Sequence, residues 1–227
     1  MVNININGQD LTVRENCTIL EAALINGFYI PTLCYHEALG FYGACRICVV
    51  EIAAPRGQIL VASCAYPVSE GLIVKTDSER VINARKLILE LLLADCPDAE
   101  IIKIMAARYG LIETRFPPEE EGKCILCGIC VRACHNLVGA GAISLIKRGK
   151  NKAVSPPYES VTSACISCGT CETMCPTRAI DIKVFDRIKS LHEYEGRFHT
   201  QRCNICSKYH VDNEKPGSVN NWIEELQ

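Results

Sequence analysis

Apolar and polar residues alternate along the first part of the chain. The stretches VNININ and LTVRE carry this alternation on either side of Gly8, as the two strands of a hairpin do. The apolar residues then take the spacing of a short helix, with Thr18 as its candidate N-cap and Gly27 just beyond its end. The chain therefore begins with a predicted hairpin that is followed by a helix.

Helical and strand patterns return later in the chain. Apolar residues recur at helical spacing over 78–94 and 98–109, and the second of these segments stops at Gly110. The short stretches AISLIK and AIDIKV each have the pattern of a strand, and each follows a cysteine-rich stretch. This mixture of strands and helices predicts an α+β fold with an internal repeat in its second half.

The composition narrows the classes of protein that fit. The chain has 227 residues, of which 48% are hydrophobic, so there is ample material for buried cores. The net charge is −2 without a polybasic run, which argues against nucleic acid or an anionic membrane as the main partner. The start lacks a secretory signal pattern, and the longest apolar run, LILELLLA, contains Glu90 and is too short to span a bilayer. We therefore expect a soluble, cytoplasmic protein.

Cysteine is the most unusual part of this composition, with 16 residues in the chain. Without an export signal the thiols are expected to stay reduced, so metal binding is favoured over disulfide bonds. The spacing agrees, because most of these cysteines fall at intervals of three, whereas disulfide frameworks scatter them.

The cysteines of the second half form two copies of one motif. Each copy reads C-x2-C-x2-C-x3-C, first from Cys124 to Cys134 and again from Cys165 to Cys175. This is the bacterial ferredoxin pattern for two [4Fe–4S] clusters, in which the fourth cysteine of each copy binds the cluster of the other. The alternatives are two zinc sites or unligated core cysteines, but zinc sites rarely pack three cysteines this closely. The first copy departs from the pattern, because His135 takes the place of the usual proline.

The crossed pattern assigns eight cysteines to two [4Fe–4S] clusters. The first cluster takes three thiolates of the first copy and the last thiolate of the second: Cys124, Cys127, Cys130 and Cys175. The second cluster takes the remaining four: Cys134, Cys165, Cys168 and Cys171. Gly128 and Gly169 lie between the cysteines and allow backbone amides to approach the sulfur atoms.

Four cysteines of the first third have the spacing C-x10-C-x2-C-x15-C: Cys34, Cys45, Cys48 and Cys64. A long loop with small residues, including Gly40 and Gly43, can wrap a flat [2Fe–2S] cluster and give two thiolates to each iron. The first interval is too long for the plant-type pattern. Cys17 lies outside the pattern and is predicted to be a small buried apolar residue.

Three stretches around these cysteines carry a resemblance to a known family: PTLCYH, GACRICVVEI and ASCAYPVSEGLIV. They resemble the ferredoxin domain at the start of the electron-input arm of respiratory complex I, a module also used by NAD-linked hydrogenases and formate dehydrogenases. The resemblance covers residues 1 to about 80 and implies a β-grasp fold. The expected order is a [2Fe–2S] domain over 1–77, a helical linker over 78–115, a two-cluster [4Fe–4S] ferredoxin domain over 116–185 and a short tail over 186–227.

The helical linker differs from the complex I family in its cysteines. That family carries H-x3-C-x2-C-x5-C here, which binds a further [4Fe–4S] cluster. Cys96 matches its first cysteine, whereas Leu92 replaces the histidine and Ala99 and Met105 replace the other two cysteines. We interpret the segment as a lost cluster that apolar helical packing has replaced; the alternative is that Cys96 serves a metal from a distance.

The last forty or so residues contain the stretch FHTQRCNICSKYH, which supplies four candidate ligands: His199, Cys203, Cys206 and His210. A tetrahedral zinc site would staple a tail that has no large core of its own. Alternatively, the first three reproduce the start of the lost cluster motif, and Cys96 completes the set across the fold. A third interpretation is that they are free cysteines and surface histidines. Trp222 in the final stretch is a candidate anchor on another subunit.

Motifs for catalysis do not occur in this sequence. There is no G-x-G-x-x-G, no P-loop, no nucleophile motif and no block for a hydrogen-activating cluster, so no catalytic residue is assigned. The whole chain resembles the small electron-transfer subunit of NAD-reducing [NiFe] hydrogenases, and also a truncated iron-only hydrogenase subunit of electron-bifurcating complexes. The resemblance implies a hetero-oligomer in which this subunit carries single electrons between a flavin and NAD(H)-binding subunit and a catalytic subunit of hydrogenase or formate dehydrogenase type.

Two other classes compete with this interpretation. A free, diffusing polyferredoxin would also carry three clusters, but such carriers tend to be small and acidic, whereas this chain is nearly neutral. A structural zinc-binding adaptor is disfavoured by the two ferredoxin motifs. Co-purification with a flavin-containing subunit that oxidises NADH would favour the electron-transfer subunit over both.

Overall fold

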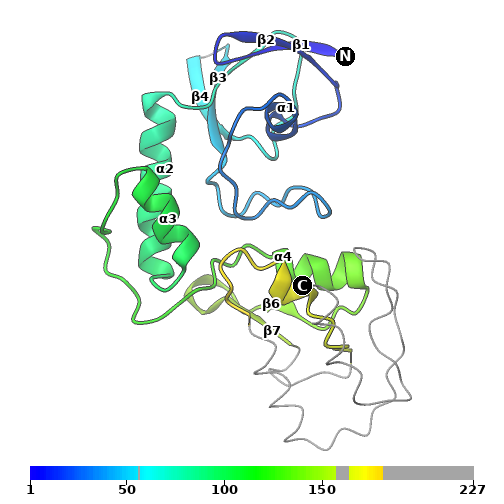
Figure 1. The fold of residues 1–227 in the computed structure, drawn as a ribbon, viewed down its shortest axis with the longest axis vertical. Coiled ribbons are helices and arrows are strands. Elements are labelled where there is room, and N and C mark those ends of the chain that lie inside the picture. The colour runs from blue at the N-terminus through cyan, green and yellow to red at the C-terminus, as the bar shows by residue number, and fades with distance from the viewer. Residues whose placement is uncertain (56, 157–163, 181–227) are drawn as a thin grey trace, which may run out of the picture. The chain divides into compact units, whose positions relative to one another are not determined.

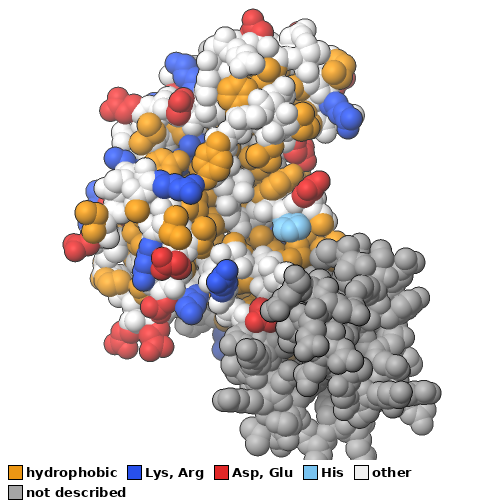
Figure 2. Space-filling view, viewed as in Figure 1, with side chains coloured by type: hydrophobic (Ala, Val, Ile, Leu, Met, Phe, Trp, Pro, Cys, Tyr) orange, Lys and Arg blue, Asp and Glu red, His pale blue; other side chains and the backbone are white. Residues whose placement is uncertain are grey.

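The computed structural model describes residues 1–55, 57–156 and 164–180. These residues belong to two compact units. Among the described residues, the first unit comprises those of 1–36 and 40–127, and the second comprises 37–39 and those of 128–156 and 164–180. Figure 1 labels the main helices and strands in chain order. On the face shown in Figure 2, acidic and basic side chains are interspersed, in keeping with the small net charge of −2.

A mixed five-stranded sheet forms the N-terminal part of the first unit, in the order β2-β1-β5-β3-β4. Only β1 and β5 run parallel, whereas the other neighbouring strands are antiparallel. The strands are β1 (Val2–Ile6), β2 (Gln9–Val13), β3 (Val49–Ala54), β4 (Gly57–Ala62) and β5 (Leu72–Lys75). Together with the helices of the unit, this sheet confirms the predicted α+β class. The finer β-grasp assignment stays a prediction.

The predicted hairpin at the start of the chain is present as β1 and β2. Val2, Ile4 and Ile6 are buried while Asn3 and Asn5 between them are more exposed, as the alternating pattern requires. Asn7 and Gly8 connect the strands with φ values of 53° and 88°. Two consecutive residues with positive φ match the right-handed twist of a tight hairpin, and Asn-Gly adopts this conformation readily.

The predicted N-terminal helix is also present, as α1 (Ile19–Ile25). The Thr18 hydroxyl accepts a hydrogen bond from the Glu21 amide, and the Glu21 carboxylate accepts one from the Thr18 amide, so the two residues form a capping box. The helix packs its buried side chains into the core beneath the sheet. Gly27 follows the end of the helix with φ of 79°, where a residue without Cβ is favoured.

The two helices predicted for the middle segment are present as α2 (Glu79–Asp95) and α3 (Glu100–Arg108). They pack against each other, and α2 also packs against β3, so this helical pair belongs to the same compact unit as the sheet (Figure 1). Ser78 caps the start of α2, where its hydroxyl accepts a hydrogen bond from the Val81 amide. Within the described ranges, no helix is long and apolar enough to cross a membrane.

The second unit contains short elements around the cysteine motifs. They are α4 (Ile129–Arg132), the π-helix η1 (Ala133–Val138), β6 (Ser144–Ile146), the 3-10 turn η2 (Gly149–Asn151), β7 (Ala153–Ser155) and α5 (Thr170–Thr173). The strand predicted in AISLIK is confirmed as β6, which pairs antiparallel with β7, a strand that was not predicted. Of the strand predicted in AIDIKV, only Ala179 and Ile180 lie among the described residues, and neither is in a strand.

Candidate metal centres

The four cysteines of the first third meet in the first unit, where each is less than a tenth exposed: Cys34, Cys45, Cys48 and Cys64. A hydrogen bond from the Cys45 side chain lowers the pKa of the Cys34 thiol to about 5. A hydrogen bond from the Cys64 side chain likewise lowers the pKa of Cys48 to about 6. The same contacts raise the pKa values of Cys45 and Cys64 well above the ordinary range. The structure therefore brings the four thiols together as two pairs.

Two pairs of thiols are the donor set that a [2Fe–2S] cluster needs, because each of its two irons takes two thiolates. The backbone amide of Cys45 also points at the Cys34 sulfur, at an N···S distance of 3.4 Å. Within the described ranges, no three His, Cys, Asp or Glu side chains converge on the position of a single metal ion.

Strand pairing explains how cysteines far apart in the sequence meet. Val49 lies opposite Ala62 in the β3–β4 ladder. Cys48 directly precedes β3, so it lies beside the residues that follow β4 and lead to Cys64. Ser63 joins the two, because its hydroxyl and its amide both donate to the Cys48 carbonyl, at 2.8 and 3.2 Å. The role of Ser63 was not predicted from the sequence, where the one indication of it is that Ser63 directly precedes the candidate ligand Cys64.

Cys17 lies outside this group, as predicted. It is half-buried at the edge of the N-terminal core, and its thiol donates to the Arg14 carbonyl at 2.9 Å. Burial raises the pKa of this thiol, with a further contribution from Glu21. A protonated thiol with a backbone partner acts as a small packing residue.

A second group of thiols lines a cavity in the second unit. Four of the residues that line it are the cysteines predicted for the second [4Fe–4S] cluster: Cys134, Cys165, Cys168 and Cys171. Apolar side chains such as Val138, Ile143 and Ile166 form much of the remaining wall. The fourth cysteine of the first motif thus shares a cavity with the first three of the second motif, which is the geometry that crossed ligation requires.

Burial keeps two of the thiols in this cavity protonated at neutral pH. Burial raises the pKa of Cys171 to about 12, with further contributions from the neighbouring thiols of Cys168 and Cys165. Burial likewise raises the pKa of Cys168. Iron must therefore compete with protons for these sulfurs, and the apolar wall would strengthen the bonds once they form.

The four cysteines predicted for the first [4Fe–4S] cluster are divided between the two units. Cys124 and Cys127 belong to the first compact unit, whereas Cys130 and Cys175 belong to the second. The grouping of these four thiols around one cluster therefore stays a prediction that rests on the motif spacing.

The two motifs have the same backbone conformation around their second cysteine. Leu126 and Gly128 flank Cys127 with φ values of 50° and 70°, and Ser167 and Gly169 flank Cys168 with 53° and 74°. In each motif a short helix begins directly after the glycine and carries the third cysteine. The internal repeat in the sequence is therefore also a repeat in local structure.

The two motifs differ after their fourth cysteine. In the first motif the Cys134 sulfur accepts a hydrogen bond at 3.2 Å from the amide of Ala142, which lies eight residues later in the chain. In the second motif the Cys175 sulfur accepts one at 3.3 Å from the amide of Ala179, which lies only four residues later. The additional residues of the first motif lie in and after the π-helix η1. His135 lies within η1, at a position where a proline would remove a backbone donor.

The positions of the lost cluster motif are packed with apolar side chains. Cys96, Ala99 and Met105 are at most 6% exposed; the first two lie between α2 and α3, and Met105 lies within α3. Burial raises the pKa of the Cys96 thiol to about 12, and the nearby Asp95 and Cys124 contribute to this rise. A protonated thiol among apolar neighbours supports the interpretation that packing has replaced the cluster.

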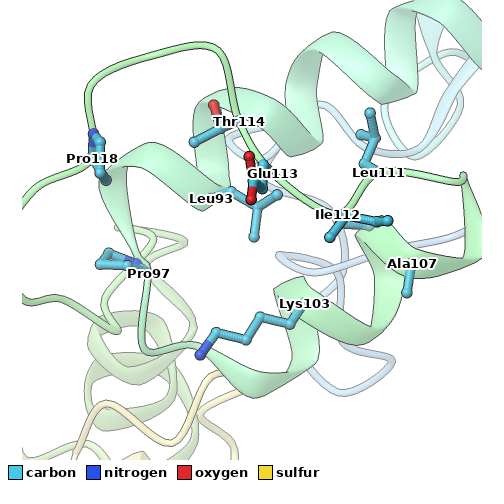
Figure 3. A pocket seen from close by; sticks show the side chains of 10 residues that line it. Leu93, Pro97, Lys103, Ala107, Leu111, Ile112, Glu113, Thr114 and Pro118 are labelled. Atoms are coloured by element: carbon cyan, nitrogen blue, oxygen red, sulfur yellow. The ribbon is translucent and has the colours of Figure 1, made fainter.

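An open groove of about 540 Å³ lies beside this helical pair. Figure 3 shows Leu93 from α2 and Ala107 from α3 near its walls, with Leu111 and Ile112 from the following loop. Lys103 and Glu113 are the charged residues that line it. The lining lacks cysteine and histidine, so the groove does not restore the missing cluster ligands.

The candidate ligands of the C-terminal stretch, His199, Cys203, Cys206 and His210, lie outside the described residues, as does Trp222. A zinc site or extra cluster at these residues stays a prediction. Loss of one equivalent of zinc in His199→Ala would identify a zinc site there.

Comparison with known proteins gives two domain matches. Residues 1–79 match the model of a 2Fe-2S iron-sulfur cluster binding domain. Residues 123–179 match the model of a 4Fe-4S dicluster domain. These matches follow the predicted order of cofactors along the chain, with one [2Fe–2S] domain and then a domain for two [4Fe–4S] clusters.

Similar proteins are subunits of redox enzymes. The chain is 36% identical to the NADP-reducing hydrogenase subunit HndD of Solidesulfovibrio fructosivorans, over 79% of this chain and 36% of that protein. It is 34% identical to the NADPH-Fe(3+) oxidoreductase subunit alpha of Geobacter sulfurreducens, over 82% of this chain and 24% of that protein. It is 32% identical to an NADH-quinone oxidoreductase subunit of Rickettsia typhi, over 82% of this chain and 30% of that protein. The chain thus spans about a quarter to a third of the length of these relatives.

A solved structure agrees with these relatives. A chain of the NAD+-reducing [NiFe]-hydrogenase in the H2-reduced state matches with a TM-score of 0.62 and 27% identity, over 80% of this chain and 81% of that one. The predicted resemblance is therefore confirmed: the chain carries a match to a 2Fe-2S cluster binding domain followed by a match to a 4Fe-4S dicluster domain, and it is a homologue of subunits of NAD(P)-linked hydrogenases and NADH-quinone oxidoreductases.

Proposed function

We propose that this chain relays single electrons through three iron–sulfur clusters inside a multisubunit oxidoreductase. The observation that carries the proposal is the cavity of the second unit, where Cys134 of the first motif meets three cysteines of the second. Such an exchange of ligands belongs to a two-cluster ferredoxin module, whose chemistry is the transfer of one electron at a time. The paired thiols of the first unit add a third centre, so the chain has the parts of an electron relay.

The proposed ligand sets use twelve of the 16 cysteines. The [2Fe–2S] cluster is held by Cys34, Cys45, Cys48 and Cys64. The first [4Fe–4S] cluster is held by Cys124, Cys127, Cys130 and Cys175. The second [4Fe–4S] cluster is held by Cys134, Cys165, Cys168 and Cys171. The amides that point at the sulfurs of Cys34, Cys134 and Cys175 would tune the potentials, because hydrogen bonds to the sulfurs stabilise the more negative reduced cluster.

The proposed partners follow from the names of the relatives. Hydrogenase and quinone oxidoreductase subunits whose names refer to NADP, NADPH or NADH point to a flavin and NAD(H)-binding subunit on one side of the relay. A catalytic subunit of hydrogenase or formate dehydrogenase type lies on the other side. The chain would occupy a hetero-oligomer in the cytoplasm. Its proposed domains are those expected from the sequence, 1–77, 78–115, 116–185 and 186–227.

The metal content of the purified chain tests this proposal. One [2Fe–2S] and two [4Fe–4S] clusters predict about ten iron atoms per chain, with a matching amount of acid-labile sulfide. Elemental analysis of anaerobically purified full-length protein gives this number directly. About fourteen iron atoms would mean that Cys96 or the C-terminal motif holds a further cubane, and a value near two would contradict the two-cluster module.

The proteins that co-purify with the native chain distinguish a permanent electron-transfer subunit from a free polyferredoxin. Co-purification with a flavin-containing subunit that oxidises NADH is the expected result for a permanent electron-transfer subunit. A lone brown monomer would instead identify a free polyferredoxin that diffuses between several partners.

A further inference from the structure

Arg85 is a buried cation in the middle of α2, with only 4% of its surface exposed. Its Nη2 donates to the Val49 carbonyl at 2.7 Å, and its Nη1 donates to the Tyr109 hydroxyl at 3.1 Å. Its Nε is buried and has no hydrogen-bond partner among the described residues. All three residues belong to the first compact unit, so these contacts lie inside one body.

The charge of Arg85 is not balanced by a carboxylate. Both hydrogen-bond partners of the guanidinium are neutral, and within the described part of the chain no ion pair includes Arg85. Glu51, the buried acid of β3, instead pairs with Arg80 at 3.2 Å. A buried charge without a counter-charge costs several kcal/mol, so residues of this kind are rare unless an anion is nearby.

The contacts of Arg85 join its guanidinium to the backbone next to one of the cysteines of the first unit. Val49, whose carbonyl it binds, directly follows Cys48 in the chain. The Cys48 carbonyl in turn accepts the hydrogen bonds of Ser63, which precedes Cys64. The guanidinium therefore binds the residue that follows Cys48, and the bonds of Ser63 link that segment to the one that carries Cys64.

We propose that Arg85 is the counter-charge of the [2Fe–2S] cluster and raises its reduction potential; this inference rests on the ligand set of the proposed function. A cluster held by four thiolates is an anion, and one-electron reduction adds one negative charge to it. A fixed cation nearby stabilises the reduced form more than the oxidised form, because the attraction grows with the charge of the cluster. The linker helix α2 would thus set the potential of a centre to which it gives no ligand.

A redox titration of the full-length, cluster-loaded protein tests this role, with the EPR signal of the reduced [2Fe–2S] cluster as the readout. In Arg85→Met we expect the ratio of reduced to oxidised cluster at a fixed solution potential to fall about tenfold, a shift of about 59 mV for one electron. Arg85→Lys keeps the charge and is expected to remain near the wild-type potential. Arg108→Met is the matched control, because it removes an equal charge that is exposed on α3, next to Tyr109.

The outcomes decide whether Arg85 sets the potential of the cluster or only stabilises the fold. An Arg85→Met protein with an intact [2Fe–2S] signal would overturn the inference if its cluster has the same potential as the cluster of the Arg108→Met control, whether or not both potentials differ from the wild-type value. If Arg85→Met fails to fold while Arg85→Lys folds, Arg85 has a structural role and the inference is also rejected. Absence of a [2Fe–2S] signal from the wild-type protein would instead reject the proposed function, which keeps the two failures distinct.

Discussion

Replacement of Cys48 by serine is expected to uncouple the complex that contains this chain from NAD(H). Electron exchange with NAD(H) should fall by more than about tenfold. Replacing a residue that only supports a metal ligand already lowers activity by about tenfold or more, and replacing the ligand itself should have a larger effect. The catalytic partner should still react with artificial dyes, which take electrons without passing through the [2Fe–2S] cluster. Steady-state assays with NADH and with a viologen dye measure the two activities side by side.

The position of the [2Fe–2S] domain in the chain is the reason for this expectation. The two proposed [4Fe–4S] clusters share one ferredoxin module and would form a continuous path, whereas the proposed [2Fe–2S] centre lies at the other end of the sequence. The resemblance of this domain to the electron-input arm of complex I implies a place near the nicotinamide end of the relay. We therefore expect the cluster to be an inlet for electrons from the nicotinamide.

Cys17→Ser is the matched control for this experiment. Cys17 lies in the same unit at the edge of the N-terminal core, outside the paired thiols, so its replacement should leave both activities unchanged. Full NAD-coupled turnover in Cys48→Ser would show that the [2Fe–2S] centre is a side branch. Electrons would then enter the [4Fe–4S] pair directly from a neighbouring subunit.

A pair of substitutions only four residues apart should damage different clusters. Cys175→Ser is expected to destroy the cluster that is bound mainly by the first motif, because the fourth cysteine of each motif serves the other. Cys171→Ser should destroy the cluster of its own motif, in the cavity that it shares with Cys134. EPR and Mössbauer spectra of the two proteins, with iron analysis, report which [4Fe–4S] signal is lost, and each variant should retain about six iron atoms.

The two spectra serve as each other's control. Loss of the same [4Fe–4S] signal in Cys171→Ser and Cys175→Ser would reject crossed ligation and assign all four cysteines of the second motif to one cluster. Loss of different signals with similar iron content is the expected result. Cys134→Ser should then match Cys171→Ser, because both thiols line one cavity.

Local patterns explain why much of the fold could be predicted. The hairpin depends on Asn7-Gly8 between alternating strands, and α1 depends on the capping box of Thr18 and Glu21, so both are determined by neighbours in the sequence. The meeting of Cys134 with Cys165, Cys168 and Cys171 could be expected for a different reason. In a two-cluster ferredoxin motif the cysteines recur at short intervals and the fourth of each copy serves the other copy, so the spacing alone indicates which thiols should share a cavity.

Features that depend on distant partners were not predicted. β7 is three residues long and forms only because β6 lies opposite it, and η1 reflects additional residues that the motif spacing does not specify. Arg85 looks like an ordinary surface residue of an amphipathic helix. Its importance emerges only when α2 packs on β3 and brings the guanidinium to the Val49 carbonyl.

Reduction of the clusters by NADH in the isolated native complex would show whether this chain is an electron relay. The complex that contains this chain is purified anaerobically, mixed with NADH and frozen for EPR spectroscopy. We expect the [2Fe–2S] signal and the [4Fe–4S] signals of this chain to develop on reduction, and to decline when the catalytic partner receives its electron acceptor. A complex in which NADH reduces the flavin and supports turnover while these clusters stay oxidised would contradict the relay.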